Sequence, residues 1–270
     1  MNGPELLAQH EGVLRTRVGA CWPGTRAVFR GHDLHRDLHD SDWMELYLFG
    51  ITGRRHTPEQ VRLLHGIWVL TSYPDARIWN NRVAALAGSS RSTPVLGMSA
   101  ALAVSEARIY GGGPGLRAID FFLRAKKAFD AGDRLLDFIA SELEARYIYG
   151  YGRPIDSCDE RLPWLAALAK ELNLDQGVHF KMAFDIENIL LETGNANLRM
   201  NYAGMTAALG ADLGFTPREF QLFLMPWFLA GMSPCWIEAA EKPEGTLFPV
   251  SCVGIAYQGV GPRVWPDKTS

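Results

Sequence analysis

Helix-forming patterns along almost the whole chain constrain its fold more than any other feature. Residues 57–60 (TPEQ) and 216–219 (TPRE) each combine a capping hydroxyl, a proline at the first helical position and a Gln or Glu three residues after the cap. Apolar residues then recur every three to four positions, as in amphipathic helices. The same spacing predicts further helices over residues 116–129, 135–148, 162–172 and 180–191.

Strands have little support in the sequence. No segment shows sustained alternation of apolar and polar residues, and only residues 247–257 are rich enough in β-branched side chains to indicate a short strand. We therefore predict an all-α fold. With 270 residues, 47% of them hydrophobic, the chain can bury a sizeable core in one large domain or in two that share a core.

Charge and apolar runs argue against two classes of partner. The formal net charge of −3 gives no basis for binding nucleic acid or an anionic membrane. The longest apolar run, residues 220–232, contains Pro226 and is too short to span a bilayer, so we expect a buried helix there. Residues 1–12 lack the basic start and apolar stretch of a secretion signal.

The cysteines and histidines give no clear disulfide or metal pattern. The four cysteines are widely scattered without paired spacing, so we expect reduced thiols and a cytoplasmic protein. His32, His35 and His39 have a spacing that could bind a metal on a helix. We favour the alternative, in which they lie on the solvated face of a charged helix, and expect no metal site.

Two glycine-bearing loops are candidate ligand sites. Residues 150–161 read GYGRPIDSCDER, in which glycines such as Gly152 let a ligand approach the backbone. Arg153 is permanently charged and can bind a carboxylate or phosphate. In the alternative, Arg153 pairs with Asp156 or Asp159 of the same loop. The second loop, GGGPG, precedes Arg117 at a predicted helix start, where an anion can bind, although such a loop is a turn in any case; its candidate residues are Gly112, Gly113 and Gly115.

The loop at residues 150–161 resembles the signature of the citrate synthase / citryl-CoA lyase superfamily, which reads G-x-G-H-x-V and, after a short gap, D-P-R. Arg153 stands where that signature has histidine. Further segments resemble other motifs of the superfamily, in the same order along the chain. Each is weak alone, whereas their order and spacing together are specific. These segments are residues 29–34, 46–58, 81–90, 109–115, 194–201, 215–217 and 231–238.

The resemblance implies a mainly helical protein of two domains with its site in the cleft between them. By the motif positions, the large domain comprises residues 1–115 and 205–270, and the smaller domain comprises residues 116–204. The resemblance also implies a homodimer. We expect the helices around residues 95–110 and 217–231 at or near the subunit interface.

The family's reaction implies roles for particular residues. In that reaction a carboxylate removes a proton from the carbon beside a thioester, histidines polarise the carbonyl groups, and arginines hold substrate carboxylates. Asn197 occupies the carboxylate position, where it would donate a hydrogen bond to an oxyanion or merely cap the next helix. Asp75 lies near a lost histidine, either as a substitute base or as a solvated turn residue.

The remaining implied ligands are arginines and glycines. Arg161 matches the D-P-R arginine, so we expect Arg153 and Arg161 to bind the anionic substrate together. Arg82 matches another family arginine, for which a structural role is favoured, and Arg263 resembles a terminal arginine that reaches the partner's site. The glycines implied to lie near the coenzyme are Gly112, Gly113, Gly115 and Gly152.

These replacements lead to two interpretations of function. The first is a divergent citrate synthase-like enzyme of biosynthesis, acting on an anionic carboxylate or acyl-thioester small molecule. A coenzyme A thioester is its candidate substrate, no further cofactor is required, and we expect no citrate formation from acetyl-CoA and oxaloacetate. The alternative is a non-catalytic homologue, a ligand-binding, regulatory or scaffolding dimer, because fold alone does not decide function.

Overall fold

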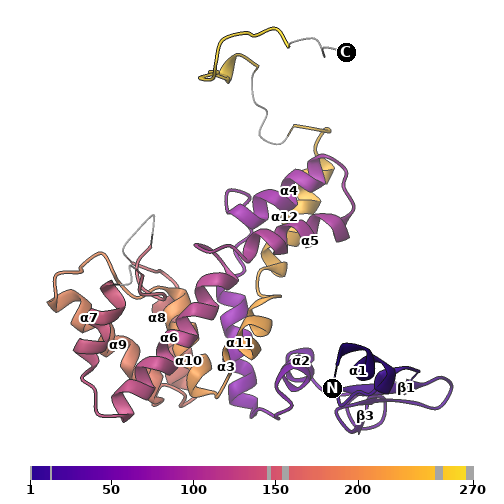
Figure 1. The fold of residues 1–270 in the computed structure, drawn as a ribbon, viewed down its shortest axis with the longest axis vertical. Helices are drawn as coiled ribbons and strands as arrows, with labels where there is room; N and C mark the ends of the chain where they lie inside the picture. Colours follow the sequence, from indigo (N-terminus) through magenta and orange to yellow (C-terminus); the bar gives the residue numbers. More distant parts are fainter. Residues whose placement is uncertain (1, 13, 145–146, 154–157, 247–251, 266–270) are drawn as a thin grey trace.

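The computed structural model describes residues 2–12, 14–144, 147–153, 158–246 and 252–265, and these are mainly helical (Figure 1). The all-α prediction is confirmed, with one small addition. Each helix expected from apolar spacing is present, although the boundaries differ by a few residues. The helices from the middle of the chain are α6 (Gly112–Asp130), α7 (Leu135–Glu144), α8 (Leu162–Glu171), α9 (Val178–Glu192) and α10 (Tyr202–Asp212).

The N-terminal region corrects two expectations. After α1 (Gly3–His10), strands β1 (Gly19–Trp22), β2 (Arg26–Phe29) and β3 (His32–Asp33) form an antiparallel sheet in that order. The strands have four residues or fewer, too few to produce a visible alternation of side chains. The predicted charged helix around His32 is therefore wrong, because His32 lies in a strand and turns follow it.

Both predicted capping signals form as expected. In α3 (Pro58–Thr71), the Thr57 side chain accepts a hydrogen bond from the Gln60 amide, and the Gln60 side chain accepts one from the Thr57 amide at 3.0 Å. The same reciprocal pair begins α11 (Pro217–Leu224). Because each pair satisfies two backbone amides that lack helical partners, both helices begin at fixed residues.

The helices gather into two groups (Figure 1). In one group, α12 (Leu229–Glu241) packs against α4 (Trp79–Ser89) and α5 (Pro94–Ser105). Gly88 of α4 allows this approach, since a Cβ there would lie 2.3 Å from the Trp236 carbonyl oxygen. In the other group, α6 packs against α9, α10 and α11, and α2 (Trp43–Thr52) packs against α3 and α11. The expected division into domains at residues 116 and 204 stays a prediction.

The core is continuous from α2 to α12 and is dominated by aromatic and aliphatic side chains. Helix α6 contributes an apolar face at helical spacing, as the sequence predicts. The N-terminus of α9 has a carboxylate cap from another helix, because Asp212 accepts hydrogen bonds from the His179 and Phe180 amides at 2.9 and 2.8 Å. Large fully buried side chains of the core include Ile119, Phe121, Phe122, Tyr202, Phe215, Phe220 and Phe223.

The apolar run near the C-terminus is the one stretch of the described residues with the length and composition to cross a membrane, at Pro217–Glu241. It is interrupted by turns between α11 and α12, and Phe220 and Met232 on it are fully buried in the core. The run is therefore partly buried, as expected, but it belongs to two helices rather than the single helix expected. Of the strand expected at residues 247–257, residues 247–251 lie outside the described residues; Cys252–Gly254 forms a short 3-10 helix, and residues 255–257 are not a strand.

Candidate functional site

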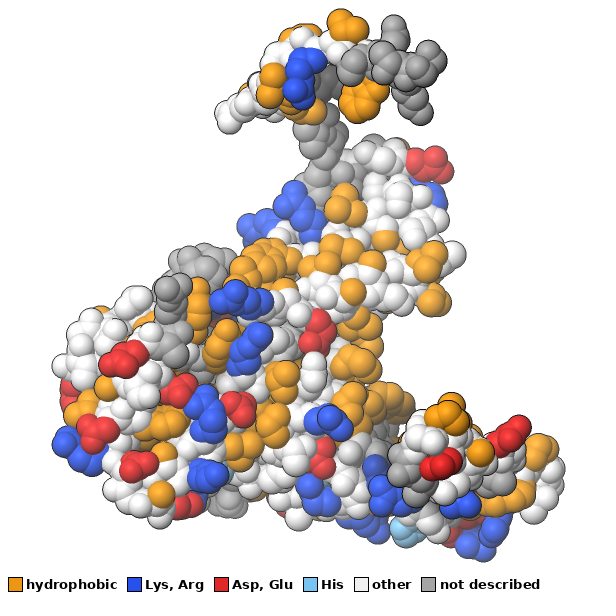
Figure 2. All heavy atoms as spheres, in the orientation of Figure 1, with side chains coloured by type: hydrophobic (Ala, Val, Ile, Leu, Met, Phe, Trp, Pro, Cys, Tyr) orange, Lys and Arg blue, Asp and Glu red, His pale blue; other side chains and the backbone are white. Residues whose placement is uncertain are grey.

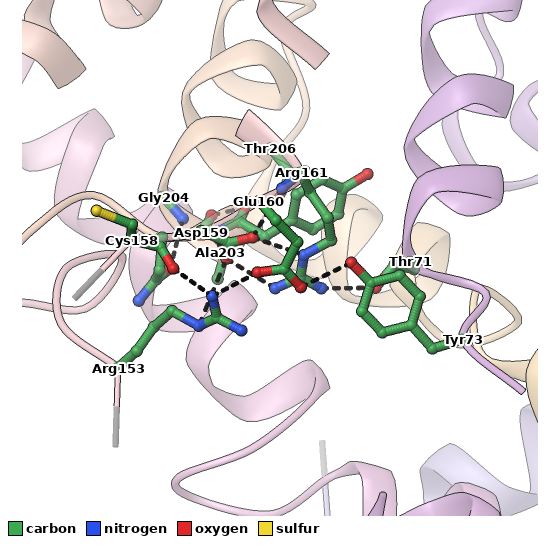
Figure 3. Close-up of polar contacts among 12 residues, drawn as sticks. Thr71, Tyr73, Arg153, Cys158, Asp159, Glu160, Arg161, Ala203, Gly204 and Thr206 are labelled. Carbon is green, nitrogen blue, oxygen red and sulfur yellow. Dashed lines mark hydrogen bonds and ion pairs between the residues drawn. The ribbon is translucent and has the colours of Figure 1, made fainter. Parts of the chain in front are cut away.

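The loop before α8 contains a buried carboxylate that organises its surroundings (Figure 3). The Asp159 side chain is fully buried and accepts hydrogen bonds from Arg161 Nε at 2.8 Å and Arg161 Nη2 at 2.7 Å. It also accepts one from the Tyr202 amide at 2.9 Å. The Arg161 guanidinium lies over the Tyr202 ring at 4.3 Å and donates to Thr71 Oγ1 at 3.1 Å. Three of the five N–H donors of this guanidinium are therefore bound to described residues of the protein itself.

A second carboxylate of the loop is held quite differently. Glu160 Oε2 accepts a hydrogen bond from Arg153 Nη1 at 2.8 Å, and Glu160 Oε1 accepts one from the Tyr73 hydroxyl at 2.8 Å. Figure 3 shows the Glu160 carboxylate between these two donors. The Glu160 side chain is 59% exposed, whereas that of Arg153 is 22% exposed. Arg153 Nε also lies 3.9 Å from Asp159 Oδ2, so both arginines lie near the Asp159 carboxylate.

Glycines position the loop against α10. A Cβ on Gly150 would lie 2.7 Å from the Gly204 Cα, so both positions need glycine for this close approach. The Gly152 amide donates to the Arg199 carbonyl at 2.6 Å, and its own carbonyl accepts from Asn201 Nδ2 at 2.7 Å. Gly152 therefore serves the loop's own geometry, which brings Arg153 next to residues 159–161.

Charges and burial set the titration of the site. Burial alone would raise the pKa of Asp159, but the hydrogen bonds and charge of Arg161, with the Tyr202 amide, lower it below its ordinary value. The pKa of Glu160 is also lowered, since its backbone amide, Arg153 and Tyr73 together outweigh burial. Burial and the hydrogen bond to Glu160 raise the pKa of Tyr73 to about 12. At neutral pH the site thus combines two carboxylates, two guanidinium groups and a neutral phenol.

The two candidate catalytic residues lie outside this cluster of contacts. Asp75 is paired with Arg77, whose Nη2 lies 2.7 Å from Asp75 Oδ2. Hydrogen bonds from the Arg77 side chain and backbone lower the pKa of Asp75 to about 2, which makes it a weak proton acceptor. Asn197 is exposed in the turn that precedes α10. The cap of α10 is instead Asn201, which accepts from the Gly204 amide, so the alternative role proposed for Asn197 belongs to Asn201.

The other candidate ligands are placed as follows. Arg82 lies on the exposed side of α4, and Arg263 lies in the exposed segment at residues 255–265. The glycines at the start of α6 are buried, and the structure gives each a packing role. A Cβ would lie 2.4 Å from Glu106 Oε1 at Gly112, 2.2 Å from the Ala107 carbonyl oxygen at Gly113 and 2.3 Å from Leu224 Cδ1 at Gly115.

Within the described residues, no group of His, Cys, Asp and Glu side chains has the arrangement of a metal site. His39 Nδ1 lies 3.2 Å from the Arg36 carbonyl, within a turn. Asp156, the other candidate partner of Arg153, lies outside the described residues. Among the described residues, Arg153 pairs with Glu160 and, at longer range, with Asp159, the other partner that the sequence offered.

Comparison with known proteins places the chain in a family. The model of the family described as "Citrate synthase, C-terminal domain" matches residues 15–245. The chain belongs to the citrate synthase family. No match was found among curated proteins.

Solved structures of this fold agree closely with the chain in arrangement. Citryl-CoA lyase from Hydrogenobacter thermophilus is 19% identical with a TM-score of 0.82, over 94% of this chain and 98% of that one. ATP citrate lyase from Methanothrix soehngenii, in complex with citrate and coenzyme A, is 16% identical with a TM-score of 0.69; the match spans 97% of this chain but 45% of that one. Citrate synthase from Thermoplasma acidophilum, with carboxymethyl coenzyme A and oxaloacetate, is 17% identical with a TM-score of 0.65, over 84% and 59% of the two chains.

Sequence reasoning missed Glu160 and Tyr73, although a signal for each was present. Glu160 stands where the D-P-R motif has proline, so the loop departs from the motif at this position as well as at Arg153. Tyr73 lies in the segment that replaces a lost histidine motif. In the structure Glu160 accepts hydrogen bonds from both Arg153 and Tyr73, so the three residues that differ from the citrate synthase motifs contact one another.

Proposed function

We propose that the chain is a divergent enzyme of the citrate synthase family that binds an anionic carboxylate or coenzyme A thioester beside the 150–161 loop. The family's chemistry is the formation or cleavage of carbon–carbon bonds with coenzyme A thioesters, and the proposal assigns that class of reaction to this chain. The observation that supports it best is the hydrogen-bonded group of Arg153, Glu160 and Tyr73. Residues that replace family motif positions still converge on one partly exposed site.

In this proposal each group has a defined task. Arg153 binds a substrate carboxylate, because a guanidinium offers paired donors that match the two oxygens. Tyr73, neutral at pH 7, donates a hydrogen bond to a carbonyl oxygen on which negative charge develops. Asp159 and Arg161 form the buried frame that fixes the loop. The thioester is the activated substrate, so the proposal needs no metal or additional cofactor.

We also propose a cytoplasmic homodimer, with α5 and the α11–α12 region near the interface. Figure 2 shows hydrophobic side chains over α4, α5 and α12 and below them toward α11. Val95 and Leu96 are 74% and 64% exposed, and Ile237 is 52% exposed. An apolar surface of this kind favours burial against a second copy. Light scattering coupled to gel filtration at micromolar concentration tests this, and a monomeric mass contradicts it.

Isotope exchange tests the proposed reaction whatever its final product. The protein is incubated in deuterated water with acetyl-CoA or longer acyl-CoAs, with and without a dicarboxylate, and deuterium at the carbon beside the thioester is measured by mass spectrometry. Exchange above background in the wild-type protein, reduced in Arg153→Met and Tyr73→Phe, supports the enzyme. The absence of exchange with any acyl-CoA, by protein that binds a dicarboxylate, overturns it.

A non-catalytic homologue is the second candidate. It is supported by the neutralisation of both arginines within the protein, since Asp159 pairs with Arg161 and Glu160 with Arg153. Such a protein would bind carboxylates or acyl-CoAs without turning them over. A thermal-shift screen over both ligand classes, run beside the exchange assay, distinguishes the two functions.

A further inference from the structure

The loop presents two neighbouring carboxylates whose environments differ sharply. The Asp159 side chain is fully buried and has three hydrogen bonds from Arg161 and one from the Tyr202 amide. The Glu160 side chain is 59% exposed, and its hydrogen bonds to Arg153 and Tyr73 both involve its carboxylate oxygens. Removing Asp159 from its partners would leave buried charge unpaired, whereas Glu160 can exchange its partners for water.

The donors that hold Glu160 are those that recognise a carboxylate ligand. A guanidinium nitrogen of Arg153 reaches one oxygen and the Tyr73 hydroxyl reaches the other, both at 2.8 Å. The backbone supports this geometry, since Arg153 Nη1 also donates to the Cys158 carbonyl at 2.5 Å. A free carboxylate that bound Arg153 and Tyr73 would need the positions that Glu160 occupies.

We propose that Glu160 is a built-in occupant of the carboxylate site, which a ligand carboxylate must displace in order to bind Arg153 and Tyr73. This inference rests on the proposed function and adds a regulation of the same site. Proline, the motif residue at this position, has no carboxylate, so the device is specific to the sequence D-E-R of this chain. Displacement leaves the Asp159–Arg161 frame unchanged, because that pair is buried and Glu160 is not.

Displacement of Glu160 by a ligand also has a structural consequence. Tyr73 follows α3 and Glu160 precedes α8, so their hydrogen bond joins segments 87 residues apart. A ligand carboxylate that replaces Glu160 takes over the bond to Tyr73, and the Glu160 side chain is released to solvent. The segment after α3 is then held through the ligand, and the bond from Arg161 to Thr71 still holds the last residue of α3.

Titration calorimetry with citrate as the probe tests whether Glu160 competes with a ligand carboxylate. We expect Glu160→Gln and Glu160→Ala to bind citrate about three- to tenfold more tightly than the wild-type protein, because an internal competitor of modest strength is removed. Glu171→Gln is the matched control. Like Glu160, Glu171 pairs with an arginine, Arg62, at 2.7 Å, and its side chain is 58% exposed, compared with 59% for Glu160. The control should leave citrate affinity unchanged, and Arg153→Met should abolish the gain.

The outcomes separate this proposal from the proposed function. The proposed competition by Glu160 is overturned if both Glu160 variants keep wild-type melting temperatures but bind citrate no more tightly than the wild-type protein, or not detectably. If those variants also lose isotope exchange while the wild-type protein shows it, the enzyme stands and Glu160 acts in the reaction instead. If the Glu160 variants bind citrate more tightly but no protein, wild-type or variant, shows isotope exchange, the competition by Glu160 is supported and the proposed enzymatic function is overturned.

Discussion

Replacement of Asp159 by alanine tests whether the loop is held by a buried ion pair. The substitution removes the acceptor of two Arg161 side-chain hydrogen bonds and of the Tyr202 amide, at 2.7 to 2.9 Å. Arg161 is 19% exposed and lies over the Tyr202 ring, so its charge would be left largely buried without a carboxylate. Breaking such a pair typically costs about 3–5 kcal/mol. That is a large share of the roughly 5–15 kcal/mol by which domains are stable.

Urea denaturation followed by circular dichroism measures this loss. Glu160→Ala is the control in the adjacent position. We expect it to cost less than Asp159→Ala because the Glu160 side chain is 59% exposed, whereas that of Asp159 is fully buried, and because Arg153 keeps the Cys158 carbonyl and the nearby Asp159 carboxylate. The double variant Asp159→Ala, Arg161→Met should recover part of the loss, since it removes the unpaired charge as well. A loss for Asp159→Ala no larger than that for Glu160→Ala would refute the buried pair.

The pH dependence of the same pair has a definite sign. The pKa of Asp159 is lowered in the folded protein from the ordinary value of 3.8. Its contribution to stability is therefore complete above that value and is lost as the pH falls through the lower folded pKa. Acid denaturation of the wild-type protein should retain this contribution at pH 5, and Asp159→Ala should lack it at every pH.

Three further predictions concern the site and its supports. Burial and Glu160 raise the pKa of Tyr73 to about 12, so the contribution of the neutral phenol to stability is complete below the ordinary pKa of 10 and is lost as the pH rises toward 12. In a near-ultraviolet pH titration, Tyr73→Phe should lack one tyrosine that titrates near 12 in the wild-type protein. If the tyrosine lost in this variant instead titrates near 10, the prediction is contradicted. Gly204→Ala places a Cβ 2.3 Å from the Gly150 carbonyl oxygen and should cost about 1–3 kcal/mol in urea denaturation, whereas Gly3→Ala, with no atom within 4 Å, should be nearly neutral. The purified protein should form no citrate from acetyl-CoA and oxaloacetate above background, since general acid–base groups typically contribute about 10²–10⁴-fold each; robust citrate formation would show that the motif alignment is wrong.

The helices were predictable because their signals are local. A capping hydroxyl, a proline and a returning Gln or Glu all lie within four residues, as at 57–60, and apolar spacing repeats within one helix. The sheet of β1, β2 and β3 escaped prediction because strands of two to four residues are too short to show a period of two. Short-range signals therefore predict elements, but only elements long enough to repeat them.

The site was predictable only in part. The sequence placed Arg153 and Arg161 on one loop and offered Asp159 as a counter-charge, and the structure joins Asp159 to both. The contact of Glu160 with Tyr73 depends on how α3 meets the loop before α8, which no local pattern specifies. The candidate base Asp75 illustrates the same limit, because its ion pair with Arg77 becomes evident only once the turn is folded.

The changes at positions 153 and 160 are physically one change. A guanidinium at 153, only 22% exposed, needs a counter-charge, and Glu160 supplies it at 2.8 Å where the motif has proline. A histidine placed alone at position 153 would face both Glu160 and Asp159, and these carboxylates would raise its pKa and favour the charged form. The charge state of a histidine at position 153 would therefore depend on the residue at position 160, because the carboxylate that balances the charge of Arg153 is the group that would hold a histidine protonated.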